Sequence, residues 1–307
     1  MALSSAAKVL DLPLLTPASN VSLARAATFK GYSFLFMAES FCTGVAQGGK
    51  ELNTIAMLDS AVTAFTSAIS VGLANATADG VQLANIARVG LARTQLQAGR
   101  KPQAIAAAQT VPAGFTYSLN YADDPAQRTR LGNRLWEFTL DPRSITVASV
   151  FRITDDPRIR FKAPTAHNLA PQDPSSGPFF IQDKYPGFNT ATRLASKLEA
   201  DYIEAEATGT AAQLAMIAAR RAANAQRPYT GGTDAAAALT ELMEQKGRDF
   251  YLEGKRMGDF RRNPAAVLNL PVPGSTYFKP GFAPVGNQTC WPLPLAETDN
   301  NQNFRKP

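Results

Sequence analysis

The sequence predicts a mainly α-helical fold with a loop-rich middle region and little β structure. Apolar side chains recur at three- and four-residue steps in the first and last thirds of the chain, which is the period of an amphipathic helix. From 112 to 189, proline-containing turns interrupt every long helical pattern. We therefore expect one domain over 1–307, made of N-terminal helical hairpins (20–112), a loop-rich region (113–190) and C-terminal helices (191–307).

The composition is that of a globular protein with a mildly basic surface. Hydrophobic residues make up 45% of the 307 residues, which is enough to build a sizeable core. Lys and Arg total 31 against 25 Asp and Glu, so the net charge is +6. Because no run of basic residues and no nucleic-acid motif accompanies this charge, we expect no nucleic-acid partner.

Two long helices are expected near the N-terminus. Large apolar residues fit a helix over 22–41, and Ser19 or Asn20 is available to cap its start. Over 58–73 the apolar residues fall on one stripe, so a second helix is expected, capped by Asp59 or starting just before it.

The next two helices are expected to form a tight hairpin. The first covers 81–98, with Gly99 where a left-handed cap is needed, and the second covers 102–111, with Pro102 in its first turn. Small residues let the two backbones approach closely: Ala87, Ala92, Ala104, Ala107 and Ala108. The spacing resembles one tetratricopeptide repeat, and an ordinary helical hairpin is the alternative.

The middle region is expected to consist mostly of loops. Its apolar residues predict one short strand over 145–153. The pairs Asp123-Asp124 and Asp155-Asp156 each precede a proline, so they indicate turns rather than ligands of a cation. Loops of this length in a compact domain are usually binding elements or disordered segments.

Three further helices are expected after the middle region. They cover 192–207, 210–225 with Thr210 as the cap, and 234–253 with Gly254 as its stop. Four acidic residues of the first helix can lie away from its apolar face: Glu199, Asp201, Glu204 and Glu206.

The segment from Arg248 to Arg262 is the most specific motif, and it resembles the C-terminal signature of the SusD/RagB family. The signature positions are Arg248, Glu253, Gly254, Arg256, Asp259 and Arg262. In physical terms the motif ends a helix at Gly254 and places Arg256 near the negative end of that helix. It also supplies Glu253 and Asp259 as partners for neighbouring arginines.

Four other segments are similar to parts of the same family. Trp291–Glu297, followed by Asn301–Asn303, resembles its C-terminal ending. Tyr202–Ala207, the pair Arg220-Arg221 and the turn Asp156–Arg158 resemble motifs upstream. The resemblance extends loosely from about Val21 to the end of the chain and is sharp over its last third.

This resemblance implies a SusD-like helical scaffold with tetratricopeptide-like hairpins and a non-enzymatic function. Members of the family bind nutrients at the outer face of a Gram-negative outer membrane and pass them to a TonB-dependent transporter. A glycan ligand is favoured over a peptide. The alternatives are a structural or assembly subunit of a surface complex or filament, and a cytosolic helical-repeat adaptor. No secretory signal is visible at Met1–Ser5, and no lipid anchor is visible in the chain.

Catalysis has little support in the sequence. His167 is the only histidine, and no serine nucleophile motif, phosphate loop or metal-ligand spacing accompanies it. We expect no enzyme activity, no cofactor and no metal. Cys42 and Cys290 lack the spacing of a redox or metal motif, so they either form a disulfide or are buried thiols.

Aromatic residues of the middle region are the predicted ligand-binding residues. Sugar C–H faces pack on aromatic rings, while sugar hydroxyls bond to polar neighbours. Trp136 and Tyr121 are the first choices, and the full set is Trp136, Tyr121, Tyr117, Phe180, Tyr185, Asn133 and Arg134. The alternative for each ring is that it anchors a long loop to the helical core.

Overall fold

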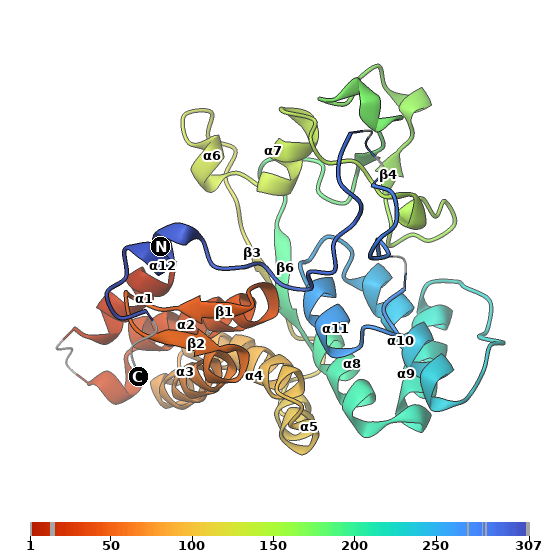
Figure 1. Cartoon of the computed structure of the whole chain (residues 1–307). Coiled ribbons are helices and arrows are strands. Elements are labelled where there is room, and N and C mark those ends of the chain that lie inside the picture. Colours follow the sequence, from red (N-terminus) through yellow and green to blue (C-terminus); the bar gives the residue numbers. More distant parts are fainter. Residues whose placement is uncertain (1, 13–15, 269, 278, 280, 305–307) are drawn as a thin grey trace.

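The computed structural model describes residues 2–12, 16–268, 270–277, 279 and 281–304. Helices from the two ends of the chain lie side by side, and the middle region rises above them (Figure 1). The mainly α-helical fold class predicted from the sequence is confirmed, with about 52% of the described residues in helices. The strands are short and pair two by two.

The helices and strands follow one another in this order: α1 (Ala2–Leu10), α2 (Val21–Ser40), β1 (Thr43–Val45), β2 (Glu51–Asn53), α3 (Thr54–Asn75), α4 (Ala78–Gln97), α5 (Lys101–Gln109), β3 (Thr116–Leu119), α6 (Arg128–Leu131), α7 (Arg134–Leu140), β4 (Phe161–Lys162), β5 (Ile181–Gln182), β6 (Thr192–Ser196), α8 (Lys197–Thr208), α9 (Thr210–Ala223), α10 (Ala235–Asp249), α11 (Arg256–Arg262) and α12 (Leu295–Asp299). Within the described residues, four 3₁₀ turns accompany them: η1 (Pro17–Ser19), η2 (Ser149–Phe151), η3 (Pro164–Ala166) and η4 (Pro174–Ser176).

The largest core lies among α2, α3 and α4, and Phe65 of α3 is at its centre. A Cβ atom added to Gly31 or Gly90 would lie only 2.6 Å or 2.4 Å from the Phe65 ring, so glycine is required for these backbones to approach. α3 is long and apolar enough to cross a membrane by composition alone. It packs between α2 and α4, with its buried face in this core.

Helix caps set the boundaries of the N-terminal helices. Asn20 caps α2 by accepting a hydrogen bond from Ser22 N at 2.9 Å. Asn53, and not Asp59, caps α3, so this helix begins earlier than its apolar stripe. Gly99 has the left-handed φ of +75° that was expected after α4. The five small alanines of the predicted hairpin are all buried.

Two antiparallel strands, β3 and β6, form a stalk from which the middle region extends. The chain leaves the helices along β3 and returns along β6, and Leu119 pairs with Thr192 at the far end. The helix predicted over 192–207 is therefore wrong for its first five residues, which form β6 before α8 begins at Lys197. The cause is long-range pairing with β3, which local periodicity cannot reveal.

The strand predicted over 145–153 is also wrong. Val147 donates one backbone hydrogen bond to Phe180 O at 3.0 Å, and the chain then turns through η2. Val147 is buried because it packs with Ile159 and Tyr251 in a small core of its own. The apolar residues of this segment therefore pack in a small core between loops and do not pair in a β-sheet.

The C-terminal helices differ from prediction at two boundaries. Thr210 is the first residue of α9, and Gly209 occupies the cap position. α10 ends at Asp249, so Gly254 does not terminate it. Gly254, with a φ of +68°, instead lies in the turn between α10 and α11, where Leu252 also has a left-handed φ of +59°.

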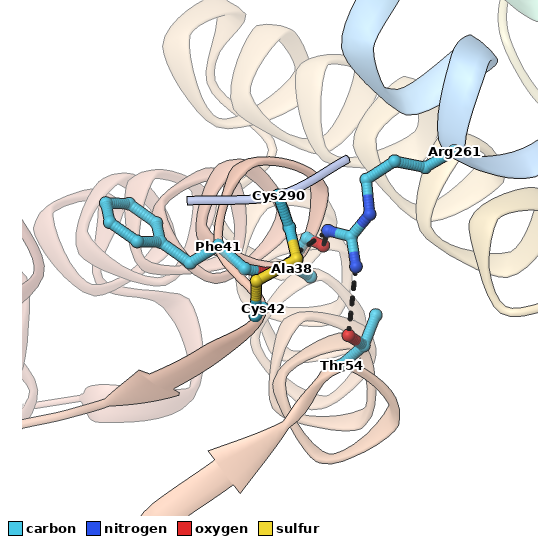
Figure 2. Close-up of a disulfide and its surroundings, with 6 residues drawn as sticks. All are labelled: Ala38, Phe41, Cys42, Thr54, Arg261 and Cys290. Carbon is cyan, nitrogen blue, oxygen red and sulfur yellow. Dashed lines mark hydrogen bonds between the residues drawn. A yellow bond between two sulfur atoms is a disulfide. The ribbon is translucent and has the colours of Figure 1, made fainter. Parts of the chain in front are cut away.

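A disulfide between Cys42 and Cys290 joins the end of α2 to the C-terminal segment (Figure 2). This resolves the two alternatives left open for the cysteines. Trp291 N donates to Ser40 O at 2.8 Å and Cys42 N donates to Trp291 O at 2.9 Å, so backbone bonds flank the disulfide. Arg261 of α11 reaches the same place and donates to Phe41 O at 3.1 Å and to Thr54 Oγ1 at 3.3 Å.

Candidate ligand-binding site

Asn133 holds the middle region together from a buried position. Its side chain, 1% exposed, accepts hydrogen bonds from Leu135 N at 3.0 Å and Trp136 N at 3.3 Å, and thus caps α7. The same amide donates to Thr190 O at 2.7 Å, and Asn133 N donates to Phe188 O at 2.7 Å. This residue therefore joins α7 to the loop before β6.

Of the other predicted ligand residues, Arg134 and Trp136 lie on α7, and Tyr121 lies in the loop between β3 and α6. Trp136 and Tyr121 are half-buried, whereas Arg134 is exposed. Arg134 donates to Glu137 Oε2 at 2.6 Å, and its guanidinium carbon lies 4.7 Å from the centre of the Phe138 ring. Arg134 therefore orients Glu137.

The remaining three predicted aromatic residues are dispersed. Tyr117 lies on β3 and packs against the main core. Tyr185 is buried, and burial raises the pKa of its hydroxyl well above the ordinary value. Phe180 lies in another loop cluster, beside Phe161, with the Arg152 guanidinium 3.8 Å from its ring centre. These three thus lie in different environments, and Tyr185 is close enough to Tyr121 for the two to interact electrostatically.

A cleft of about 460 Å³ opens on one side of α7. Its lining comes from α6, α7 and the loop before β6: Pro125, Arg128, Thr129, Glu137, Leu140, Asp141 and Phe188. The Arg128 guanidinium stacks over the Phe188 ring at 4.5 Å and its Nε donates to Asp123 Oδ1 at 2.8 Å. Asn133 and Arg134 support this cleft through their bonds to Phe188 O and Glu137.

The cleft combines an aromatic ring with carboxylates and a guanidinium. Such a set can bond hydroxyl groups of a ligand while the ring contacts an apolar face. Phe188 follows a Pro-Gly turn in the same middle region as the predicted aromatic ligand residues, so the sequence contained a signal for it. Arg128, Glu137 and Asp141 carried no such signal.

His167 is half-buried, and both of its ring nitrogens have partners. Nε2 lies 3.1 Å from Phe179 O, and Nδ1 accepts from Leu169 N at 3.2 Å. Within the part of the chain that the structure describes, no three His, Cys, Asp or Glu side chains are placed to hold a metal ion.

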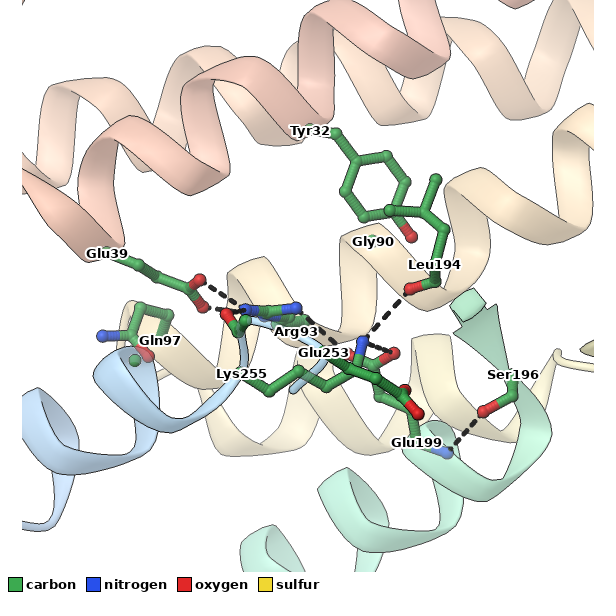
Figure 3. Close-up of polar contacts among 12 residues, drawn as sticks. Tyr32, Glu39, Gly90, Arg93, Gln97, Leu194, Ser196, Glu199, Glu253 and Lys255 are labelled. Atoms are coloured by element: carbon green, nitrogen blue, oxygen red, sulfur yellow. Dashed lines mark hydrogen bonds and ion pairs between the residues drawn. The ribbon is translucent and has the colours of Figure 1, made fainter. Parts of the chain in front are cut away.

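The signature segment lies in a network of buried ion pairs (Figure 3). Arg93 of α4 donates to both carboxylate oxygens of Glu39, at 2.8 Å and 2.5 Å, and lies 3.4 Å from Glu199. Lys255 pairs with Glu199 at 2.6 Å. The side chains of this cluster thus connect α2, α4, α8 and the turn before α11.

The signature residues pair with charges from the rest of the chain. Glu253 accepts from Lys184 at 2.8 Å and from Arg193 at 2.8 Å, which joins the turn before α11 to the middle region and β6. Arg248 lies 3.7 Å from Asp156 of the Asp-Pro-Arg turn. Arg256, through its Nη2, lies 3.4 Å from Glu244 near the end of α10.

A second group of signature residues forms the end of this network. Asp259 pairs with Lys246 at 2.6 Å and with Arg262 at 2.8 Å, and Arg262 also binds Glu206 at 2.7 Å. Burial raises the pKa of Asp259 and Glu206, but the charges of Lys246 and Arg262 outweigh it, so both pKa values are lowered. The charged carboxylates therefore favour the folded state.

No family model and no curated protein matches the sequence. Among solved structures, a SusD-like carbohydrate-binding protein from Bacteroides vulgatus has a TM-score of 0.70 and 13% identity, over 99% of this chain and 81% of that one. A SusD-like carbohydrate-binding protein from Bacteroides fragilis has a TM-score of 0.63 and 14% identity, over 99% of this chain and 83% of that one. A laminarin-binding SusD-like protein has a TM-score of 0.62 and 14% identity, over 99% of this chain and 82% of that one.

Proposed function

Because this chain has the SusD fold, we propose that it binds a carbohydrate without changing it chemically. The observation that carries the proposal is the extent of the structural similarity. Two proteins named as carbohydrate-binding each superpose on 99% of this chain. A third neighbour is named for binding laminarin. A glycan is therefore favoured over a peptide, and no step of catalysis is assigned.

The proposed glycan site is the cleft beside α7. A sugar ring there contacts Phe188 with its C–H face, while its hydroxyls bond to Glu137, Asp141 and Arg128. The support is geometric, since these side chains converge from three segments on one space of about 460 Å³. Trp136 and Tyr121 do not line this cleft and are retained as separate candidates for contact with the ligand.

The proposed location is the outer face of an outer membrane, attached by a lipid, with delivery of the glycan to a TonB-dependent transporter of the SusC type. The support is the fold, together with the disulfide. A disulfide between Cys42 and Cys290 suits an oxidising compartment, which is the environment of surface and periplasmic proteins.

The test is a titration of the purified protein against panels of glycans and peptides, with heat measured directly. For a glycan that binds, Glu137→Gln is expected to weaken affinity about tenfold, through loss of a charged hydrogen bond. Phe188→Ala is expected to weaken it about threefold to tenfold, through loss of ring contact. Phe282→Ala removes an exposed phenylalanine elsewhere and is the matched control.

Binding of peptides alone would replace the proposed ligand class. Binding of a glycan that neither Glu137→Gln nor Phe188→Ala weakens would place the site elsewhere. Trp136→Ala and Tyr121→Ala, measured with the same glycan, test the two residues chosen first from the sequence.

A further inference from the structure

Trp291 presents its indole to solvent from a rigid backbone. The side chain is 64% exposed, although an indole is a large apolar group that folding usually covers. The residue lies between the disulfide-bonded Cys290 and Pro292, and its N–H and C=O both bond to the end of α2. A ring on such a backbone is positioned before any ligand arrives, so binding costs little ordering.

A cavity of about 510 Å³ lies beside this ring. Trp291 lines it together with half-buried Phe151 and buried Tyr251, so aromatic groups meet there from three segments. This volume lies within the range of small-molecule sites, about 300–1,000 Å³. The cavity is separate from the cleft beside α7, because the two share no lining residue.

The polar side chains that line the cavity are of two kinds: buried side chains that are already paired, and one side chain at the rim. Lys246, Lys255 and Asp259 line it, but each is buried and engaged in the ion network. Arg256 lines the rim with its side chain 23% exposed, and its Nη2 bonds to Glu244 and to Leu268 O. A guanidinium carries five donors, so Arg256 retains donors for a ligand.

We propose that this cavity is a second saccharide-binding site, with Trp291 as the stacking surface and Arg256 as the hydroxyl-binding group. A sugar ring fits because it offers an apolar face to the indole and hydroxyls to the rim, in a space of suitable size. The inference rests on the proposed function for its ligand class. It assigns a site that is distinct from the cleft at Phe188.

The chain offers a direct test because Trp136 and Trp291 are its only tryptophans. Trp136→Phe leaves Trp291 as the only indole fluorophore, and Trp291→Phe leaves Trp136. Each variant is titrated with a glycan that the unmodified protein binds. In the Trp136→Phe protein, the emission of Trp291 is expected to shift saturably with glycan concentration.

A second pair of variants separates this site from the cleft. Trp291→Ala is expected to remove one class of binding sites in calorimetry, or to weaken it about threefold to tenfold, while Phe282→Ala leaves it unchanged. Glu137→Gln is expected to leave the Trp291 signal unchanged. Because Trp291 is exposed, its replacement by Ala leaves the folded state intact, which a urea midpoint verifies.

The outcomes distinguish the two proposals. Glycan binding that Glu137→Gln weakens, with no change in Trp291 emission, overturns the second site and supports the cleft. A Trp291 signal without any effect of Glu137→Gln or Phe188→Ala supports the second site and overturns the cleft. A failure to bind any glycan overturns both, whereas a Trp291→Ala effect limited to binding of a protein overturns the second site alone.

Discussion

Replacing Arg93 with Met removes a buried cation and leaves a carboxylate of the ion network without its main partner. The Arg93 and Glu39 side chains are 7% and 4% exposed, and two hydrogen bonds join them. Glu199 keeps Lys255 at 2.6 Å after the substitution. The variant therefore leaves one unpaired buried charge, at Glu39, and not two.

The expected cost is that of breaking one buried ion pair, about 3–5 kcal/mol in the free energy of unfolding. This is a large part of the total for an ordinary domain, which is about 5–15 kcal/mol. It corresponds to a fall of roughly 1–2 M in the urea midpoint. The double variant Glu39→Met with Arg93→Met removes both charges, so most of the lost stability is expected to return.

The assay is urea unfolding at neutral pH, followed by far-ultraviolet circular dichroism. Arg25→Met is the matched control, because Arg25 pairs with Asp79 at 3.5 Å on the surface and its loss costs at most about 1 kcal/mol. A loss below 1 kcal/mol for Arg93→Met would refute the reasoning. A double variant no more stable than the single one would also refute it, since the cost would then not come from an unpaired charge.

Three other perturbations test separate features. Cys42→Ser or Cys290→Ser is expected to lower the free energy of unfolding by about 2–5 kcal/mol, and thiol reductant should then have no further effect; an unchanged urea midpoint would contradict the disulfide. The buried carboxylates of the ion network have pKa values below their usual 3.8 and 4.5. The stabilisation from these charged carboxylates is present above their ordinary pKa values and is lost as the pH falls through the lowered pKa values of the folded state. The urea midpoint should therefore be steady near neutral pH and fall below about pH 4.5. A urea midpoint that does not change in acid would disprove this. Gly90→Ala is expected to cost about 1–3 kcal/mol because its Cβ would meet Phe65, whereas Gly286→Ala, with open space around it, should cost far less; equal thermal midpoints for the two would be evidence against the close packing.

Helical periodicity predicted the existence of the long helices but not their ends. The boundary of α3 depends on Asn53, whose side chain reaches Ala56 N, whereas the apolar stripe begins only at Leu58. The start of α8 depends on a strand that pairs with residues more than seventy positions earlier in the chain. Local patterns carry no information on such pairing, so β6 was predicted as helix.

The burial of acidic residues on α8 was also not predictable from local sequence periodicity. Glu199 and Glu206 were expected away from the apolar face of their helix, yet both are buried. Their cations come from α4 and from the signature segment, so only the assembled fold brings these charges together. The candidate cleft could likewise not be predicted from the sequence, because its lining residues come from three segments that only the folded chain brings together around Asn133.

The pairing of β3 with β6 also has a consequence for how such a protein can change. Residues 120–191 begin and end at neighbouring positions, since Leu119 lies opposite Thr192. A segment whose two ends are already held together can change in length with little strain on the strands that hold it. Ion pairs of Lys184 with Glu253 and of Asp156 with Arg248 also join this segment to the helices. Grafting a different middle region onto β3 and β6 is therefore a route to a new ligand when the graft keeps these two pairs.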